Sequence, residues 1–438
     1  MQPTDFVAAL RAAAPYVHAH RGRVFVVAFG GEGATRTDFD QLIYDVALLH
    51  SLGVKLVLVH GARPQIDARL AERGIKTKHH NGVRVTDPAA LECVRDAVGS
   101  LRMTIEARLS TSLASTPMGG ARVKVAGGNW ITARPIGVRD GVDHQLSGEV
   151  RRVDVDSIRA ALDQGRIALV SPIGYSPTGE IFNLRFENVA TAVASQLAAE
   201  KLVFLVDAKP DDWKLADDTG DAGQISIVAA RKWLQSAKDA QDRQYLEAAV
   251  AAADAGVKRI HLIGNDAEGG LLRELYTLNG AGLMLYSDEN YESMRDATIE
   301  DIGGVLALIG PLEAAGVLVP RSREQLELEI GHFSVMVRDR VVIACCALYP
   351  FPQNKMGELA CVAVHPEYQD AGRAAALLKR VETTAKKKGL KKLFSLTTHS
   401  PHWFIERGFR DGKIKDLPVQ KQRIYNYQRN SLVLVKDL

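Results

Sequence analysis

The residues with the clearest chemical meaning lie between an apolar segment and an amphipathic helix in the last third of the chain. A turn at Pro366 follows the apolar run Val362–Val364, and a short loop containing Gly372 then leads into the helix. Such a loop points several backbone N–H groups at one spot, at the positive end of the helix dipole. Gly372 has no side chain, so a ligand can approach the backbone closely. The pattern predicts a phosphate or pyrophosphate site, although an ordinary strand–turn–helix connection has the same outline.

The segment around this loop resembles the GNAT family of N-acetyltransferases. The resemblance rests on the pattern Gln369-x-x-Gly372-x-Ala374, on the strand Leu393–Thr397 that follows, and on the aromatic helical ending Trp403–Phe409. It implies that the loop holds the pyrophosphate of acetyl-CoA. The residues expected to contact this co-substrate are Cys361, Val362, Val364, Gln369, Asp370, Ala371, Gly372, Arg373 and Ala374.

The same resemblance assigns catalytic roles to three residues. An amine acetylated from a thioester must first lose a proton, and Glu358 matches the family's general base. An exposed glutamate at a strand end is the alternative interpretation of Glu358. Transfer in this family is direct, so Cys361 is expected to offer its backbone N–H to the thioester carbonyl rather than to act as a nucleophile. Thr397 could hydrogen-bond the departing thiolate or the carbonyl, with Tyr425 and Tyr427 as further candidate acids.

The elements that position these residues begin near residue 296. Two helices come first, with Thr298 as a plausible cap, and they are followed by three strands, the loop and its helix, a strand, a helix and a last strand. This order matches the α+β fold of the GNAT acetyltransferases. The strands expected besides Leu393–Thr397 are Phe333–Val337, Val341–Leu348, Glu358–Val364 and Leu432–Val435.

The composition excludes several classes of protein. At 438 residues the chain is too long for one core, so two or three domains are expected. Hydrophobic content of 46% and charged content of 24% are typical of a soluble globular protein, and a net charge of +3 is too small to indicate nucleic acid or an anionic membrane as a partner. The four cysteines lack C-x-x-C spacing, so no structural metal is expected. The sequence also shows no apolar signal segment and no long apolar run, which together with the few cysteines predicts a cytoplasmic protein.

The first two-thirds of the chain alternate strand and helix patterns. Continuous apolar runs predict a doubly wound, mostly parallel α/β sheet covered on both faces, and residues 121–152 are expected to form a hairpin excursion. We therefore place the first domain at 1–287, a linker at 288–295 and the second domain at 296–438. The predicted strands of the first domain are Val24–Phe29, Val54–Val59, Ile167–Val170, Leu202–Val206, Arg259–Ile263 and Leu283–Tyr286.

Three separated segments of the first domain resemble the amino-acid kinase family, with the closest likeness to acetylglutamate kinase. They are Phe29–Glu32, His60–Ile66 and the spaced residues of 179–187. Phosphoryl transfer requires a cation beside the transferred group, usually Lys, Arg or a metal. Ala28 stands where the kinases have a lysine, Ala62 interrupts the second glycine run, and no glycine occurs in 207–211. The kinase chemistry is therefore expected to be lost, leaving the glycines as turns in a scaffold.

A second feature of this domain resembles the arginine-inhibited acetylglutamate kinases. An N-terminal helix carries Tyr16, and in those proteins the corresponding tyrosine lies against bound arginine, as suits a flat cation. The resemblance implies an arginine site formed by Tyr16, Glu274, Gly280 and Gly282, in which the carboxylate and open backbone groups clamp the ligand. The alternative is a helix that packs only against a neighbouring subunit.

Over nearly its full length the chain resembles the bacterial N-acetylglutamate synthases, in which a GNAT domain follows a silent kinase-like domain. The likeness is sharpest at 319–324, 343–351, 358–366 and 425–431. It implies that acetyl-CoA and L-glutamate give N-acetyl-L-glutamate and CoA, at the entry to arginine synthesis. Feedback inhibition by L-arginine and a homo-oligomer, a hexamer, are implied by the same resemblance, and no metal is expected.

Glutamate carries two carboxylates, which bidentate arginines bind well. Arg321 and Arg429 match the substrate-clamping positions of the family, and Val319 and Cys361 are expected beside the substrate. Arg323 competes with Arg321, and either clamp residue could be an ordinary surface arginine.

Two other functions remain open. A bifunctional synthase–kinase is one, and Ala28 and the broken glycine runs argue against it. A non-catalytic arginine sensor is the other, and the intact loop 369–374 together with Glu358 argues against that, because a sensor has no need of an acetyl-CoA site.

Overall fold

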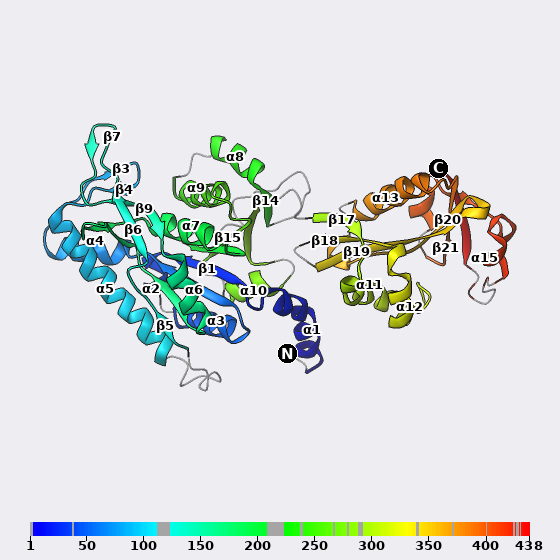
Figure 1. Cartoon of the computed structure of the whole chain (residues 1–438), viewed down its shortest axis with the longest axis horizontal. Helices are drawn as coiled ribbons and strands as arrows, with labels where there is room; N and C mark the ends of the chain where they lie inside the picture. The colour runs from blue at the N-terminus through cyan, green and yellow to red at the C-terminus, as the bar shows by residue number, and fades with distance from the viewer. Residues whose placement is uncertain are drawn as a thin grey trace. The chain divides into compact units, whose positions relative to one another are not determined.

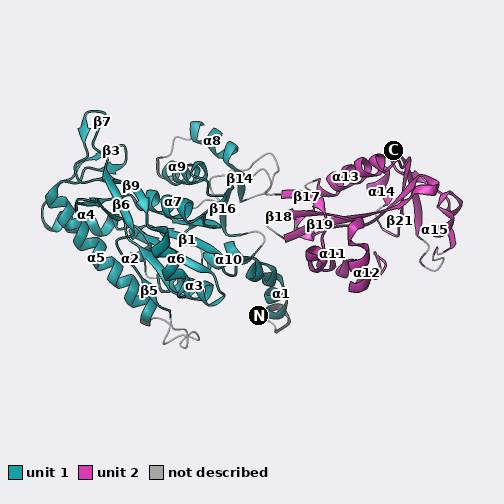
Figure 2. Ribbon diagram, in the orientation of Figure 1, with its two compact units in different colours: residues 1–288 teal, residues 289–438 magenta. Residues whose placement is uncertain are grey.

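The computed structural model consists of two compact units, residues 1–288 and 289–438 (Figure 2). It describes all residues except 1–2, 37–38, 112–122, 208–222, 237–239, 266–267, 278–279, 288–291, 339–340, 370–371, 400, 424, 426–428 and 430. Over the described ranges, no helix is long and apolar enough to cross a bilayer. All four cysteines are buried and free of disulfides.

Unit 1 is built on an eight-stranded sheet with the order β14-β16-β15-β13-β1-β2-β10-β5 (Figure 1). Neighbouring strands are parallel except β15 and β16, which are antiparallel. Each predicted strand of this unit lies within one residue of its expected bounds. The strands are β1 (Val24–Phe29), β2 (Lys55–His60), β5 (Val125–Ala126), β10 (Ile167–Val170), β13 (Lys201–Val206), β14 (Gln224–Ser226), β15 (Arg259–Gly264) and β16 (Gly282–Tyr286).

Alternate residues of each central strand point to opposite faces of the sheet, and both sets are apolar. Both faces must therefore be buried, and helices cover them. Val26 and Ala28 pack with α7 and α9, whereas Phe25 and Val27 pack with α3, α5 and α10. The helices are α1 (Pro3–His20), α2 (Gly31–Thr35), α3 (Phe39–Ser51), α4 (Arg63–Glu72), α5 (Pro88–Thr111), α6 (Val155–Asp163), α7 (Phe186–Gln196), α8 (Ile227–Ser236), α9 (Ala240–Asp254) and α10 (Gly270–Tyr276).

The excursion predicted over 121–152 is larger than a hairpin. Its first strand, β5, joins the edge of the main sheet, and later strands form part of a separate four-stranded sheet with the order β12-β11-β6-β9. Two short hairpins, β3–β4 and β7–β8, complete the unit. The bounds are β3 (His79–His80), β4 (Val83–Arg84), β6 (Ile131–Pro135), β7 (Val138–Arg139), β8 (Val142–Asp143), β9 (Gly148–Val153), β11 (Ile173–Tyr175) and β12 (Ile181–Asn183).

Unit 2 is a seven-stranded sheet with the order β17-β18-β19-β20-β21-β23-β22. Its pairs are antiparallel except β20 and β21, which run parallel. The strands are β17 (Glu292–Asp296), β18 (Phe333–Arg338), β19 (Val341–Phe351), β20 (Met356–Val364), β21 (Lys392–Thr397), β22 (Arg410–Asp411) and β23 (Leu432–Asp437). The α-helices are α11 (Ile302–Ala314), α12 (Arg323–Glu329), α13 (Arg373–Lys387), α14 (Pro401–Ile405) and α15 (Val419–Arg423).

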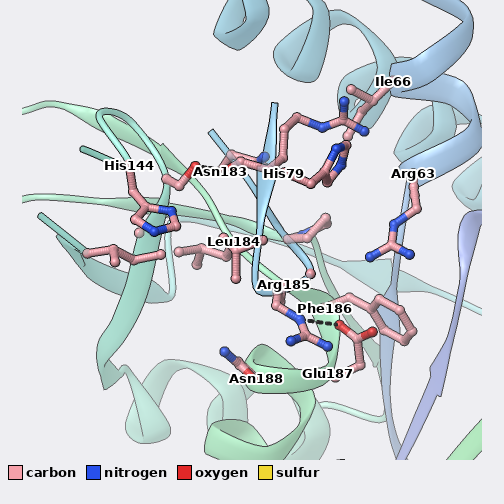
Figure 3. A pocket seen from close by; sticks show the side chains of 18 of the residues that line it. Arg63, Ile66, His79, His144, Asn183, Leu184, Arg185, Phe186, Glu187 and Asn188 are labelled. Atoms are coloured by element: carbon pink, nitrogen blue, oxygen red, sulfur yellow. Dashed lines mark hydrogen bonds and ion pairs between the residues drawn. The ribbon is translucent and has the colours of Figure 1, made fainter. Parts of the chain in front are cut away.

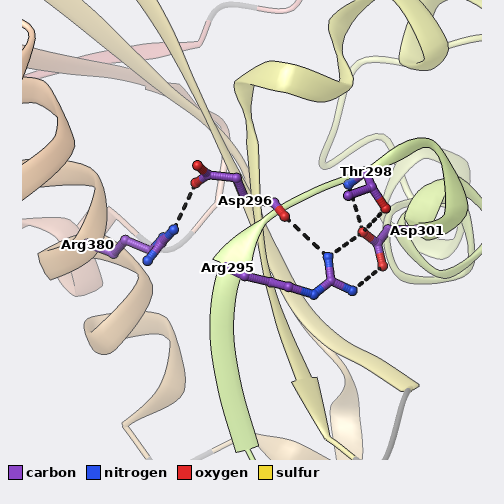
Figure 4. Close-up of polar contacts among 5 residues, drawn as sticks. All are labelled: Arg295, Asp296, Thr298, Asp301 and Arg380. Carbon is purple, nitrogen blue, oxygen red and sulfur yellow. Dashed lines mark hydrogen bonds and ion pairs between the residues drawn. The ribbon is translucent and has the colours of Figure 1, made fainter. Parts of the chain in front are cut away.

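The edge strand β17 was not predicted, and the expected linker 288–295 is wrong from residue 292 onward. Ion pairs with later parts of the unit hold this strand (Figure 4). Arg380 of α13 pairs with Asp296 at 2.8 Å, and Arg295 donates to both carboxylate oxygens of Asp301 at 2.6 and 2.8 Å. Thr298 and Asp301 form a capping box, which confirms the predicted helix cap at Thr298. The strand depends on partners that are distant in the sequence, so local pattern could not reveal it.

Candidate active site

The central feature of unit 2 is a gap that opens between two parallel strands. β20 and β21 pair only where Met356–Glu358 lies beside Lys392–Phe394. β20 continues to Val364, and beyond Glu358 its described residues form no ladder with β21. The backbone on this edge is therefore available to an extended ligand, as an exposed sheet edge is.

A β-bulge lies within this open stretch. The register of β20 against β19 shifts between Cys345 and Ala347, and the extra residue is on β20. Cys361 has a φ of 52° there, a left-handed conformation that costs about 1–3 kcal/mol for a residue with a side chain. A β-bulge interrupts the ladder and changes the direction of the neighbouring peptide and side-chain groups. The peptide groups at this bulge are therefore directed out of the β19–β20 ladder. It coincides with the predicted backbone donor at Cys361 and with Val362.

The loop after β20 ends at the N-terminus of the 15-residue helix α13. Gly372 caps the helix with a φ of 73°, and a Cβ placed on it would meet nothing within 4 Å. The helix N-terminus therefore borders open space, and Ala374 lies in its first turn. Gln369 donates from Nε2 to the Val364 carbonyl at 3.3 Å, which closes the loop back onto β20. Asp370 and Ala371, also predicted to contact acetyl-CoA, lie outside the described residues.

The side chain of Arg373 is committed to the protein. It is buried, and its Nη2 and Nε donate to Glu292 of β17 at 2.8 and 2.9 Å. Its Nη1 donates to the carbonyl of Tyr368, and its guanidinium lies 5.1 Å from the centre of that ring. The guanidinium predicted to bind the co-substrate thus anchors the loop to the edge strand, which leaves the backbone of Arg373 to meet a phosphate.

Glu358, the candidate base, is only 7% exposed and lies opposite Tyr349 in the β19–β20 ladder. Its Oε2 lies 2.7 Å from Nζ of Lys421 in α15, without hydrogen-bond geometry. A buried carboxylate is costly unless a counter-charge or a donor is close. Lys421 supplies that charge, and no feature of the sequence indicated this pairing.

A polar cluster adjoins Cys361. The hydroxyl of Tyr349 donates to Glu329 at 2.6 Å, and Arg321 hydrogen-bonds the same tyrosine. Burial raises the pKa of the Cys361 thiol to about 11, against the opposing charge of Arg321, and Glu358 adds to the increase. The thiol is therefore protonated at neutral pH, which argues against a nucleophilic cysteine.

Arg321 and Arg429, the two clamp candidates, meet the same loop after α11. Arg321 donates from Nη1 to the Val319 carbonyl at 2.9 Å, and Arg429 donates to the Val317 carbonyl at 2.5 Å. The tertiary structure thus brings together two arginines that are far apart in the sequence. Val319 itself is 54% exposed.

The candidate acids are held by local hydrogen bonds. The hydroxyl of Thr397, at the end of β21, donates to the His399 carbonyl at 2.5 Å. Tyr425 donates to the Ser431 carbonyl at 2.5 Å, and Tyr427 lies outside the described residues. Among the described residues, no group of His, Cys, Asp and Glu side chains could hold a metal ion.

Comparison with known proteins decides the family. Residues 23–264 match the amino acid kinase family, and residues 310–409 match the acetyltransferase (GNAT) family. The amino-acid acetyltransferases of Azotobacter vinelandii and Pseudomonas putida are each 50% identical to this chain, over 99% of it and 100% of their own length. The chain belongs to the amino-acid acetyltransferase family.

Solved structures extend this relationship to the fold. N-acetylglutamate synthase from Neisseria gonorrhoeae, complexed with coenzyme A and L-arginine, is 36% identical with a TM-score of 0.81, and the match covers 99% of both chains. The same enzyme complexed with coenzyme A and N-acetyl-glutamate is 37% identical with a TM-score of 0.61, over the same coverage. The predicted fold class, a kinase-like α/β unit followed by a GNAT unit, and the predicted acyltransferase class are confirmed.

In unit 1, the groups of the candidate arginine site are hydrogen-bonded to one another. Glu274 is buried, and its Oε2 accepts hydrogen bonds from the backbone N–H groups of Ala281 and Gly282 at 2.7 and 3.0 Å. Its Oε1 lies 2.5 Å from His261, and a Cβ at Gly280 would lie 2.4 Å from the carboxylate. The sequence predicts that these backbone groups are open to a ligand. They are instead bonded to Glu274, so a ligand would have to replace those contacts.

Tyr16, the remaining candidate, lies on α1 above α10. Its ring centre is 6.2 Å from that of His20, and His20 contacts the Leu275 carbonyl through Nε2 at 2.8 Å. The N-terminal helix is thereby attached to the segment that carries Glu274. The structure brings Tyr16 to the same region as the other three candidates.

Sequence reasoning missed four residues that contact the candidate site residues or their neighbours, namely Tyr349, Glu329, Lys421 and Glu292. Only Tyr349 had a usable signal, since extending the predicted strand Val341–Leu348 by one residue would include it, and it pairs with Glu358 in the observed β19. The other three act through side-chain contacts between distant segments, which no periodicity encodes.

Proposed function

We propose that unit 2 transfers the acetyl group of acetyl-CoA to the amino group of L-glutamate. The observation that carries the proposal is the open edge of β20, followed by a short loop that ends at the N-terminus of α13. The edge can pair with the amide-containing arm of the co-substrate, and the helix terminus can hold its pyrophosphate. The Neisseria gonorrhoeae relative, solved with coenzyme A and with N-acetyl-glutamate, supports this choice of substrates.

Glu358 takes a proton from the ammonium group of glutamate. The positive charge of Lys421 offsets the negative charge of this buried carboxylate. The freed amine attacks the thioester carbonyl carbon. Peptide N–H groups re-aimed by the bulge at Cys361 stabilise the oxyanion as the C–N bond forms. The C–S bond then breaks as the nitrogen loses its second proton. The departing thiolate takes up a proton to give CoA, with Thr397 as the first candidate to hydrogen-bond the thiolate or relay that proton.

Recognition of glutamate rests on Arg321 and Arg429, which approach one loop from two segments. Each can exchange its backbone carbonyl contact for a stronger bond to a substrate carboxylate. Tyr349, which donates to Glu329, lies beside Arg321. The protein would discriminate glutamate from neutral amino acids by these two charges.

We further propose that unit 1 is a regulatory domain that binds L-arginine near Tyr16 and Glu274. The relative crystallised with L-arginine supports an effector of this kind. We expect inhibition, a cytoplasmic location and assembly into a homo-oligomer.

An acetyl-transfer assay against a panel of amino acids, with and without arginine, tests the proposal. We expect glutamate to be strongly preferred and its acetylation to fall in the presence of arginine. Preference for another acceptor would refute the substrate assignment. Turnover of ATP with N-acetylglutamate would instead reveal a bifunctional synthase–kinase.

A further inference from the structure

One cavity of unit 1, of about 340 Å³, lies where β1, β2 and β10 end. Gly31, Gly61 and Pro172 line it from the segments that follow these strands, and His144 lines it from a neighbouring hairpin (Figure 3). His144 is only 2% exposed, and neither ring nitrogen has a hydrogen-bond partner among the described residues. Open α/β sheets bind their ligands at the carboxyl ends of the strands, so this cavity is the expected ligand pocket of the kinase-like fold.

A separate cavity of about 310 Å³ lies between α3 and the segment that joins β15 to α10. Phe39, Leu42 and Asp45 line it from α3, and the opposite wall runs from Ile263 at the end of β15 to Leu271 in the first turn of α10. Its described lining residues include none that line the first cavity. The size is that of a site for a small molecule.

Asp45 points to a ligand for this second cavity. The residue is 9% exposed, and its carboxylate forms no hydrogen bond or ion pair with any described residue. Burial without a counter-charge raises the pKa of Asp45 to about 6, so the group is still ionised for the most part at neutral pH. A buried charge is costly unless it is paired, and a cation bound in the cavity would remove that cost.

The rest of the wall also favours a cation over an anion. Glu268 adds a second carboxylate at the exposed rim, and Gln41 and Asn265 add amide oxygens that can accept hydrogen bonds. Arg36 is the one cationic side chain among the described lining residues, and it already has an interaction partner in the chain. An anionic ligand would be repelled by both carboxylates.

The lining suits an organic cation better than a metal ion. No group of His, Cys, Asp and Glu side chains among the described residues, here or elsewhere, could hold a metal. Phe39, Leu42 and Leu205 instead present apolar surface on which methylene groups can pack. Phe39 is the one aromatic side chain in the described wall, so the cavity lacks the aromatic cage that a quaternary ammonium prefers.

We propose that this cavity binds a small alkylammonium ion, with a primary ammonium group that donates to Asp45 and an alkyl chain that packs on Phe39 and Leu42. A primary ammonium carries three N–H donors, which match the carboxylate and amide oxygens of the wall. The site shares no described lining residue with the arginine candidates Tyr16 and Glu274. The inference does not depend on arginine binding, or on which amino acid unit 2 acetylates.

The test is calorimetric titration of the full chain with n-butylammonium, which has neither a carboxylate nor a guanidinium group. Asp45→Asn removes the charge and keeps the shape of the side chain. Asp40→Asn is the matched control on the same helix, because Asp40 is exposed and pairs with Arg108. We expect Asp45→Asn to weaken binding about 10-fold or more, as for loss of a charge-assisted contact, and Asp40→Asn and Tyr16→Ala to leave it unchanged.

Thermal unfolding provides a second readout. Without ligand, Asp45→Asn should keep or raise the melting temperature, because it removes an unpaired buried charge, and n-butylammonium should then raise it less than in the wild type. Absence of binding to the wild type would overturn the proposal, as would equal binding in Asp45→Asn or loss of binding in Tyr16→Ala.

Ligand analogues test the same site without a variant. Tetramethylammonium has the charge but no N–H to donate, and 1-butanol has the chain but no charge, so both should bind the wild type at least about 10-fold more weakly than n-butylammonium. Equal affinity of either analogue would overturn the proposal. This comparison decides the matter even if Asp45→Asn does not fold.

Discussion

At the scale of single residues, the active-site region depends on charges that are buried in pairs. Glu358 is nearly inaccessible, yet Lys421 lies 2.7 Å from it. Cys361 is close to Glu358, and burial raises the pKa of its thiol to about 11, so the thiol is protonated at neutral pH. These observations support the proposal that the carboxylate accepts the proton and that the cysteine contributes through its backbone.

Glu358→Gln should lower kcat by about 10²–10⁴-fold while changing the KM for acetyl-CoA little. The amide keeps the shape of the side chain but cannot accept the proton. Steady-state kinetics at neutral pH measures both constants. Near-normal turnover would show that another group is the base.

Arg321→Ala or Arg429→Ala should raise the KM for glutamate by about 10–150-fold, the range for losing one charge-assisted hydrogen bond. The KM for acetyl-CoA should not change. Assays with glutamine as acceptor identify which arginine holds the side-chain carboxylate, because that variant should no longer prefer glutamate. Unchanged glutamate kinetics in both variants would refute the clamp.

His60 should make unit 1 less stable in mild acid. It is fully buried, its Nε2 lies 2.9 Å from Ser171, and burial lowers its pKa from 6.5 to about 4. Between these values the unfolded chain binds more protons than the folded one, so stability is lost as the pH falls. The loss is about 2 kcal/mol between pH 7.5 and pH 5. Urea unfolding at the two pH values should show a smaller difference in His60→Gln, and an equal difference in both proteins would contradict the assignment.

At the scale of elements, β17 connects the co-substrate loop to the start of unit 2. Glu292 at one end of the strand binds Arg373, the first residue of α13, and Asp296 at the other end binds Arg380. The first pair is partly buried and multidentate, whereas the second is largely exposed. The first contact should therefore contribute far more to the position of the loop.

Glu292→Gln should raise the KM for acetyl-CoA, because Arg373 loses its carboxylate and the α13 N-terminus loses its anchor. An increase of about 10-fold or more corresponds to one charge-assisted contact. Arg380→Gln is the matched control on the same helix and should change the KM by less than about threefold. Equal effects of the two substitutions would mean that β17 does not position the loop.

At the scale of the whole molecule, a kinase-like unit is joined to an acetyltransferase unit. Coupling requires arginine to prefer one of two states of the protein. The bonds of Glu274 to Ala281 and Gly282 define one such state, since they occupy the groups that would clamp the ligand. Arginine binding would exchange these bonds for contacts with the guanidinium.

Tyr16→Ala should abolish the response of acetyl transfer to arginine and leave the basal rate unchanged. A typical coupling energy of about 1–3 kcal/mol gives roughly 5–150-fold modulation in the wild type. Activity is measured against arginine concentration for both proteins, with calorimetry for direct binding. If wild-type activity is flat in millimolar arginine and no binding is detected, unit 1 is not an arginine sensor.

The sequence by itself determined the two fold classes, the acyltransferase family and the position of the loop that precedes α13. Apolar runs such as Val24–Phe29 encode buried parallel strands, and the loop at Gly372 has a local pattern, because both signals lie within a few neighbouring residues. Only the tertiary structure decided which charges meet. Packing of distant segments places Lys421 beside Glu358 and Glu292 beside Arg373, and it leaves the buried His144 unsatisfied within the described part of the chain. Sequence periodicity predicts which residues are buried, but it does not predict which distant side chain a charged residue will contact.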